Sequence, residues 1–137
     1  LAEKAGLQRI RFYPLQPYEK LSALLASADI HLVLQKKSAS DLVMPSKLTG
    51  ILAAGGCAIV SAVPGTSLYE TVHEHQIGLL IEPESTDALV KGLLLALDSD
   101  LTPFRQRARQ YAERFLSKAS LLRDFEQNLL KLISHEN

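Results

Sequence analysis

Short apolar runs alternate along the chain with longer segments in which apolar residues recur at helical spacing. Four short runs predict β-strands, and these runs cover residues 10–13, 30–34, 57–61 and 78–81. The helical spacing predicts helices over residues 18–28, 45–55, from 67, 86–98, from 102 and over about 119–133. The run at 30–34 is almost entirely apolar, which is typical of a strand that is buried on both faces in a parallel sheet.

Capping residues predict where several of these helices begin. Pro45 stands at the start of one helix, in the position that tolerates the missing N–H of proline. Ser67 and Glu70 have the spacing of a capping box, and Thr102 is followed by Pro103 like an N-cap residue before a first helical proline. We therefore expect Ser67 and Thr102 to cap their helices.

The order of the elements predicts the fold class. Strands alternate with helices through short connections, which is typical of right-handed crossovers and a parallel sheet. The last two helices follow one another with no strand after them. We expect an α/β domain with a Rossmann-like parallel sheet, helices on both faces, about four strands and two C-terminal helices.

Composition narrows the classes of function. The chain has 137 residues, enough for one domain, and its 15 basic residues balance its 15 acidic residues. It therefore carries no net field that would attract nucleic acid or an anionic membrane. The lone Cys57 fits a reducing compartment, and no apolar run reaches the roughly 20 residues of a membrane span. A start at Leu1 without methionine predicts that the chain is part of a longer protein.

The candidate chemistry lies in the loops that should follow the strands. In open parallel sheets, ligands bind beyond the carboxyl ends of the strands, here in loops 14–18, 35–46 and 62–67. The second loop runs into a helix that begins Ser46-Lys47. The N–H groups and dipole of a helix start suit a phosphate, and Lys47 adds a positive charge. Taken alone, such a start is usually only a helix cap.

A longer pattern around this helix resembles a known family. Pro45-Ser46-Lys47-Leu48-x-x-x-Leu52-Ala53-x-Gly55, then a strand, then Pro64-Gly65, is similar to the donor-site segment of glycosyltransferase family 4. The resemblance covers about residues 6–135 and is closest to bacterial exopolysaccharide enzymes of the colanic-acid type. It implies that the chain is the C-terminal, donor-binding half of a GT-B fold, with the N-terminal acceptor domain absent from residues 1–137.

The resemblance also implies a function and a set of site residues. The function is transfer of a sugar from a nucleotide diphosphate sugar to a glycan or lipid-linked acceptor in polysaccharide biosynthesis, with no cofactor and no metal. The base would lie near loop 14–18, and no catalytic residue can be assigned within this chain. The implied donor-binding residues are Ser46, Lys47, Leu48, Gly65, Thr66 and Glu70.

Three further expectations follow from the resemblance. The protein would be cytoplasmic, with any contact to the inner face of the membrane made through the domain that this chain lacks. The chain alone would be inactive, because half of the donor cleft is absent. It would also self-associate through the surfaces that the absent domain leaves bare.

Two positions depart from the family pattern. Its paired glutamates, eight positions apart, fall on Leu42 and Gly50, and a glycine cannot hold the ribose hydroxyls. Asp41 is a possible substitute for the first glutamate. Glu70 matches a family glutamate, yet the capping box accounts for it without a ligand, so both interpretations stay open.

Two other classes of function fit a fold of this kind. A flavodoxin-like receiver or interaction module would need an acidic pair after the first strand and a lysine after the last, and neither is present. A GT-B epimerase would need catalytic carboxylates that this chain does not show. His73 and His75 lie two positions apart on a predicted helix and lack metal-ligand spacing, and His31 is expected to be a hydrogen-bonded core residue.

Overall fold

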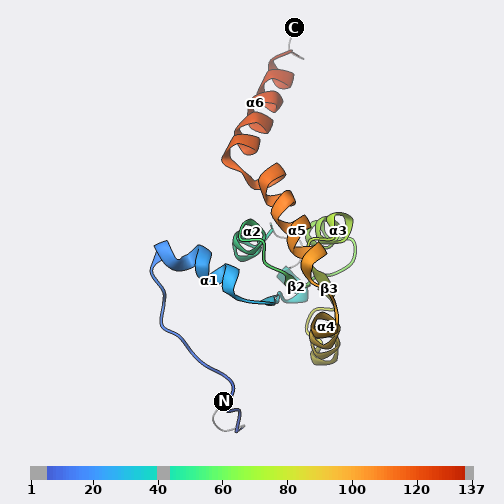
Figure 1. Ribbon diagram of the computed structural model, residues 1–137. Helices are drawn as coiled ribbons and strands as arrows, with labels where there is room; N and C mark the ends of the chain where they lie inside the picture. The colour runs from blue at the N-terminus through green and yellow to red at the C-terminus, as the bar shows by residue number, and fades with distance from the viewer. Residues whose placement is uncertain (1–5, 40–43, 135–137) are drawn as a thin grey trace.

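Three parallel strands form the centre of the molecule. The computed structural model describes residues 6–39 and 44–134 (Figure 1). The strands β1 (His31–Val33), β2 (Ala58–Ser61) and β3 (Leu79–Ile81) lie in the order β1-β2-β3. Leu32 pairs with Ile59, and Ile59 in turn pairs with Leu79, so the three strands are in register across the sheet. The parallel sheet predicted from the sequence is confirmed.

Helices connect the strands and continue after the last one. The 3₁₀ turns are η1 (Tyr18–Lys20) and η2 (Lys37–Ala39). The α-helices are α1 (Leu21–Ser27), α2 (Ser46–Ala53), α3 (Ser67–His75), α4 (Thr86–Asp98), α5 (Thr102–Tyr111) and α6 (Lys118–Ser134). A π-helical segment, η3 (Ala112–Leu116), directly continues α5 and is followed by α6 after one residue. The two consecutive C-terminal helices predicted from the sequence correspond to α5 and α6, which follow α4 with no strand between them.

The two faces of the sheet are covered by different helices. Ala58 and Val60 belong to a buried cluster to which α2, α3 and α5 contribute side chains. On the opposite face, a Cβ placed on Gly92 of α4 would lie only 2.7 Å from Cγ2 of Ile81 and 3.7 Å from Cγ2 of Ile59. Figure 1 shows α4 on one side of the sheet and α2 and α3 on the other. Helices on both faces are therefore confirmed.

The strand predicted over residues 10–13 is wrong. These residues adopt no regular structure, and Phe12 is 86% exposed. A strand is held by ladder hydrogen bonds to a neighbour, and within the described residues β1 pairs only with β2. The N-terminal segment instead runs away from the sheet (Figure 1). The described part of the chain therefore has three strands and not about four.

The start of α5 also differs from the prediction. Thr102 is the first helical residue, and Leu101 occupies the N-cap position without a side-chain cap. The carboxylate of Asp100 accepts the Thr102 N–H at 2.9 Å, and this bond lowers the pKa of Asp100. An aspartate stabilises a helix start better than a threonine hydroxyl can, because it also interacts with the helix dipole.

None of the helices within the described residues is both long enough and apolar enough to cross a lipid bilayer.

Candidate functional site

The carboxyl ends of the three strands meet at one edge of the sheet. Because the strands are parallel, the loops after β1, β2 and β3 all emerge there, and each leads into a helix start, of α2, α3 and α4. This edge, called here the carboxyl edge, therefore gathers three helix N-termini, and helix N-termini attract anionic groups.

Lys47 is tied to the backbone of β1. Its Nζ donates a hydrogen bond of 2.8 Å to the carbonyl oxygen of Leu32, while the side chain stays exposed. Ser46 is the first residue of α2 and is also exposed. The first N–H groups of a helix have no acceptor within it, so the starting residues Ser46 and Lys47 present polar groups at this edge. The structure thus places both residues at the start of α2, and their role in donor binding stays a prediction.

Leu48 is placed differently from its two neighbours. Its side chain is fully buried in the core with Ile51 and Leu52, and its N–H donates to the carbonyl oxygen of Pro45 at 2.8 Å. The spacing of these three residues turns one face of α2 towards the sheet. Leu48 therefore anchors the helix start and has no side-chain atom available to a ligand.

Thr66, and not Ser67, caps α3. The Thr66 hydroxyl accepts the Tyr69 N–H at 3.3 Å and donates to the carbonyl oxygen of Val63 at 2.7 Å. Ser67 is already the first helical residue. The predicted helix start is correct, but the cap lies one residue earlier because Thr66 keeps an extended backbone and points its hydroxyl back into the turn.

Gly65 and Glu70 close the same turn from the other side. A carboxylate oxygen of Glu70 accepts the Gly65 N–H at 3.2 Å, and Gly65 has φ = +85°, a conformation that favours glycine. The turn after β2 is thus complete without a ligand. An anion that used the Gly65 N–H would first have to displace the Glu70 carboxylate.

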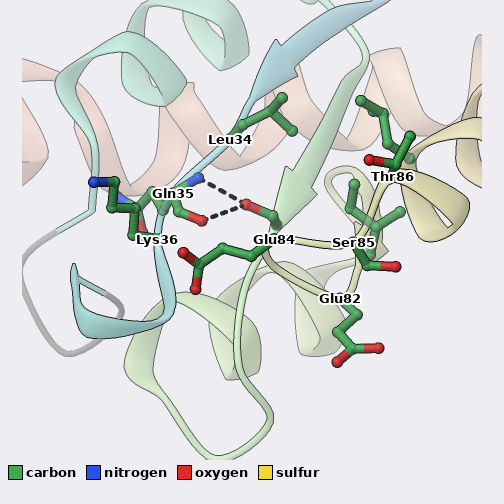
Figure 2. A pocket seen from close by; sticks show the side chains of 10 residues that line it. Leu34, Gln35, Lys36, Glu82, Glu84, Ser85 and Thr86 are labelled. Atoms are coloured by element: carbon green, nitrogen blue, oxygen red, sulfur yellow. Dashed lines mark hydrogen bonds between the residues drawn. The ribbon is translucent and has the colours of Figure 1, made fainter.

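A cavity of about 380 Å³ lies at the carboxyl edge on the side of α4 (Figure 2). Ser61, at the end of β2, accepts the Gln35 N–H at 2.7 Å and donates to the Gln35 carbonyl oxygen at 3.1 Å. The side-chain oxygen Oε1 of Gln35 is buried and has no hydrogen-bond partner among the described residues. The cavity is lined by Leu34, Gln35, Lys36, Ser61, Ile81, Glu82, Glu84, Ser85, Thr86 and Leu89.

Two glutamates connect the loop after β1 to the loop after β3. Glu84 accepts the Lys37 N–H at 3.3 Å, and Glu82 pairs with the Lys37 ammonium at 3.3 Å. Glu84 has φ = +59°, which is unfavourable for a residue with a side chain. Glu82 and Lys37 also line a second cavity of about 550 Å³, which extends towards Tyr69 of α3. Sequence analysis did not select Gln35, Ser61, Glu82 or Glu84, because only the tertiary fold brings their loops together.

A third cavity, of about 400 Å³, lies between α1 and α2. It is lined by Tyr18 from the end of loop 14–18 and by Gly50, together with residues of α1 that include Leu25. A Cβ on Gly50 would lie 3.4 Å from Cδ1 of Leu25, which is within ordinary contact distance. Gly50 and loop 14–18 are therefore neighbours. Leu42 and Asp41 lie outside the described residues.

The other residues considered from the sequence have structural partners. His31 Nε2 lies 2.8 Å from the carbonyl oxygen of Leu25, as expected for a hydrogen-bonded residue, and His73 stacks on Tyr69 with ring centroids 5.8 Å apart. Burial raises the pKa of the Cys57 thiol, although Arg105 opposes this shift. In the part of the chain that the structure describes, no group of three or more His, Cys, Asp or Glu residues could hold a metal ion.

Comparison with known proteins relates the chain to a family model and to a named relative. The family model described as "Glycosyl transferases group 1" matches residues 1–115. WcaI of Escherichia coli (strain K12), which is named as a colanic acid biosynthesis glycosyl transferase, is 46% identical over 127 residues. The match covers 91% of this chain and 30% of WcaI, so the chain spans less than a third of that relative. The resemblance noted in the sequence is confirmed over most of the chain, and the chain belongs to the group 1 family of glycosyl transferases.

Proposed function

We propose that the protein containing this chain transfers a sugar from a nucleotide diphosphate sugar to a glycan or lipid-linked acceptor in polysaccharide biosynthesis. The observation that carries the proposal is the family match over residues 1–115. The likeness to WcaI supports a role in polysaccharide biosynthesis, because that relative is named for colanic acid biosynthesis. No feature of the described residues favours a receiver or interaction module.

In this proposal the carboxyl edge binds the diphosphate of the donor. The start of α2 offers N–H groups and the positive end of its dipole. Lys47, whose ammonium donates to the Leu32 carbonyl oxygen in this structure, would add a positive charge to the site. Ser46 adds a hydroxyl, whereas Leu48 serves only to fix the helix in the core. When the bond between sugar and phosphate breaks, negative charge develops on the departing diphosphate. Fixed dipoles and a lysine stabilise that charge without a metal.

The turn after β2 would provide a second contact with the diphosphate. Gly65 and Thr66 lie at the same edge, but the Gly65 N–H is bonded to Glu70 in this structure. Binding of the sugar nucleotide would therefore require Glu70 to release that N–H. The Glu70 carboxylate could then accept a hydrogen bond from a hydroxyl group of the sugar nucleotide. This assigns Glu70 two roles in turn, first as a partner within the turn and then as a ligand-binding group.

The nucleoside would extend from the phosphates towards α1. The cavity of about 400 Å³ that contains Tyr18 and Gly50 is within the size range of small-molecule sites, and it joins loop 14–18 to α2. With glycine at position 50, the cavity has no carboxylate there for the ribose hydroxyls. Donor affinity would then depend more on the phosphate contacts than in family members with a glutamate at this position.

We further propose that acceptor binding and catalysis need the part of the protein that corresponds to the uncovered length of WcaI. Such a protein would act in the cytoplasm, with any membrane contact made by that other part. The apolar side chains that α6 exposes, namely Leu121, Leu122, Phe125, Leu129 and Leu130, would drive self-association when this chain stands alone.

The test compares this chain with the full-length protein. Each is incubated with a panel of nucleotide diphosphate sugars and lipid-linked acceptors, and the released nucleoside diphosphate and the glycosylated product are measured. We expect turnover by the full-length protein and none above background by residues 1–137. An inactive full-length protein with every donor and acceptor, or turnover by this chain alone, would contradict the proposal.

A further inference from the structure

A small cavity lies at the end of the sheet opposite to the carboxyl edge. It has a volume of about 140 Å³ and is lined by His75, Arg107, Gln110, Tyr111, Arg114 and Phe115. His75 is the last residue of α3, after which the chain turns through Gln76 and enters β3 at its amino end. The cavity is therefore on the far side of the molecule from the residues proposed to bind the donor.

The polar groups of the cavity come mainly from one side of α5 and η3. Arg107, Gln110 and Arg114 are spaced by three and four residues, so they lie along the same face of a continuous helical segment. The His75 ring packs on the rings of Tyr111 and Phe115, with centroids 4.8 and 5.4 Å apart. The three packed rings and the side chains of two arginines and a glutamine thus line the cavity together.

Both guanidinium groups are restrained by their neighbours. Arg107 Nε donates to the carbonyl oxygen of Gln76 at 3.0 Å, and the guanidinium carbon of Arg107 lies 5.0 Å from the centre of the Phe104 ring. Arg114 lies at the same distance, 5.0 Å, from the Phe115 ring. Groups held in this way lose little conformational freedom when they bind a ligand.

The charge of these two arginines is not balanced by a bound carboxylate. Among the described residues, Arg105 pairs with Asp29 and Arg109 pairs with Glu113, whereas neither Arg107 nor Arg114 is in an ion pair. The exposed Glu74 is close enough to raise the pKa of Tyr111, after the larger effect of burial. The residues that line the cavity include two arginines and no carboxylate, so the lining carries an excess of positive charge.

We propose that this cavity binds the phosphate group of an anionic ligand. The planar donor fork of arginine matches phosphate oxygens, and the Gln110 amide and the His75 ring supply further hydrogen bonds. Sites for drug-sized molecules usually exceed about 300 Å³, so a cavity of about 140 Å³ fits a single phosphate group better than a sugar nucleotide. The group could belong to free phosphate or to a phosphomonoester lipid headgroup.

The first experiment titrates inorganic phosphate into the ¹⁵N-labelled chain at constant ionic strength, with chloride as the balancing anion. We expect amide shifts at residues 75–76 and 107–115 and no matching shifts at the starts of α2 and α3. Arg114→Gln should weaken binding by roughly 10- to 100-fold, because a charge-assisted hydrogen bond is lost. Glu74→Gln should tighten it by about two- to fivefold, because a nearby like charge is removed.

Arg123→Gln is the matched control, since it removes an equal charge from the exposed surface of α6. It should leave phosphate binding unchanged, and thermal melts should show all three variants folded. The source of the phosphate is tested by co-sedimentation with phosphatidylcholine vesicles that contain or lack phosphatidic acid. Capture that needs both phosphatidic acid and Arg114 identifies a lipid headgroup, whereas phosphate binding without such capture identifies a soluble ligand.

The proposal is overturned if phosphate gives no shifts around the cavity, or if Arg114→Gln and Arg123→Gln weaken binding equally. These outcomes are independent of sugar transfer, because the carboxyl edge is unaltered in every variant.

Discussion

Replacement of Lys47 by alanine tests the most specific assignment at the carboxyl edge. The change removes one ammonium group next to the start of α2 and its hydrogen bond to the Leu32 carbonyl. A charge-assisted hydrogen bond to phosphate contributes about 1.5–3 kcal/mol, so the affinity for a nucleoside diphosphate should fall roughly 10- to 100-fold. Lys47→Arg keeps the charge and should retain most of the affinity.

The same substitution should hardly change stability. Loss of the exposed hydrogen bond to Leu32 costs about 0.5–1 kcal/mol. Removal of a positive charge from a helix N-terminus restores about 0.3–1 kcal/mol, because a cation there opposes the dipole. The two terms nearly cancel, so denaturant midpoints should almost coincide.

The assay is isothermal titration of the chain with uridine, guanosine and adenosine diphosphates in turn, at low salt. Lys91→Ala is the control, because Lys91 is an exposed lysine on α4 and this variant has the same net charge as Lys47→Ala. Equal dissociation constants for wild type and Lys47→Ala would refute the reasoning, and so would an equal loss of affinity in Lys91→Ala.

Three further predictions concern packing and association. Gly92→Ala should lower the free energy of unfolding in urea by about 1–3 kcal/mol, because the new methyl group would lie 2.7 Å from Cγ2 of Ile81. Gly50→Ala should raise it by up to about 1 kcal/mol, and a Gly92→Ala variant more stable than Gly50→Ala would contradict the packing described. Cys57 is buried and its pKa is raised, so a maleimide should label it at neutral pH only on unfolding, and rapid labelling of the native chain would contradict this. Light scattering should show self-association that Phe125→Glu reduces, and a monomer at high concentration would show that the exposed face of α6 does not associate.

The sequence predicted the parallel sheet well, because local pattern and tertiary role agree there. The strand Ala58–Ser61 is buried at every position, so the apolar run Ala58-Ile59-Val60 within it reflects cover on both faces of the sheet. The strand predicted at 10–13 failed for the complementary reason. Its alternating pattern reports a preference for extended backbone, but a strand also needs a neighbour for its ladder bonds.

Within the site, the sequence predicted where the helix begins, but it did not predict which of the first side chains of the helix are exposed. Ser46, Lys47 and Leu48 are consecutive, yet the helix turns Leu48 into the core and leaves the other two at the edge. A helix start identified from a proline–serine pair does not tell which of the next side chains is buried. That depends on where the sheet lies relative to the helix.

The loop residues were missed because their partners are distant in sequence. Gln35 bonds to Ser61, and Lys37 bonds to Glu82 and Glu84, across 26 to 47 positions. No local spacing signals such contacts. They arise because the carboxyl ends of adjacent parallel strands come together at one edge.

The central claim is that this part of the protein binds the diphosphate of a nucleotide sugar at the carboxyl edge. Its most direct test is a ¹H–¹⁵N map of amide shifts on titration with the nucleoside diphosphate that binds most tightly. The claim predicts the largest shifts at residues 46–48, 65–66 and 70, with smaller ones around Tyr18 and Gly50. Shifts confined to other surfaces, or no shifts with any nucleoside diphosphate at millimolar concentration, would contradict it.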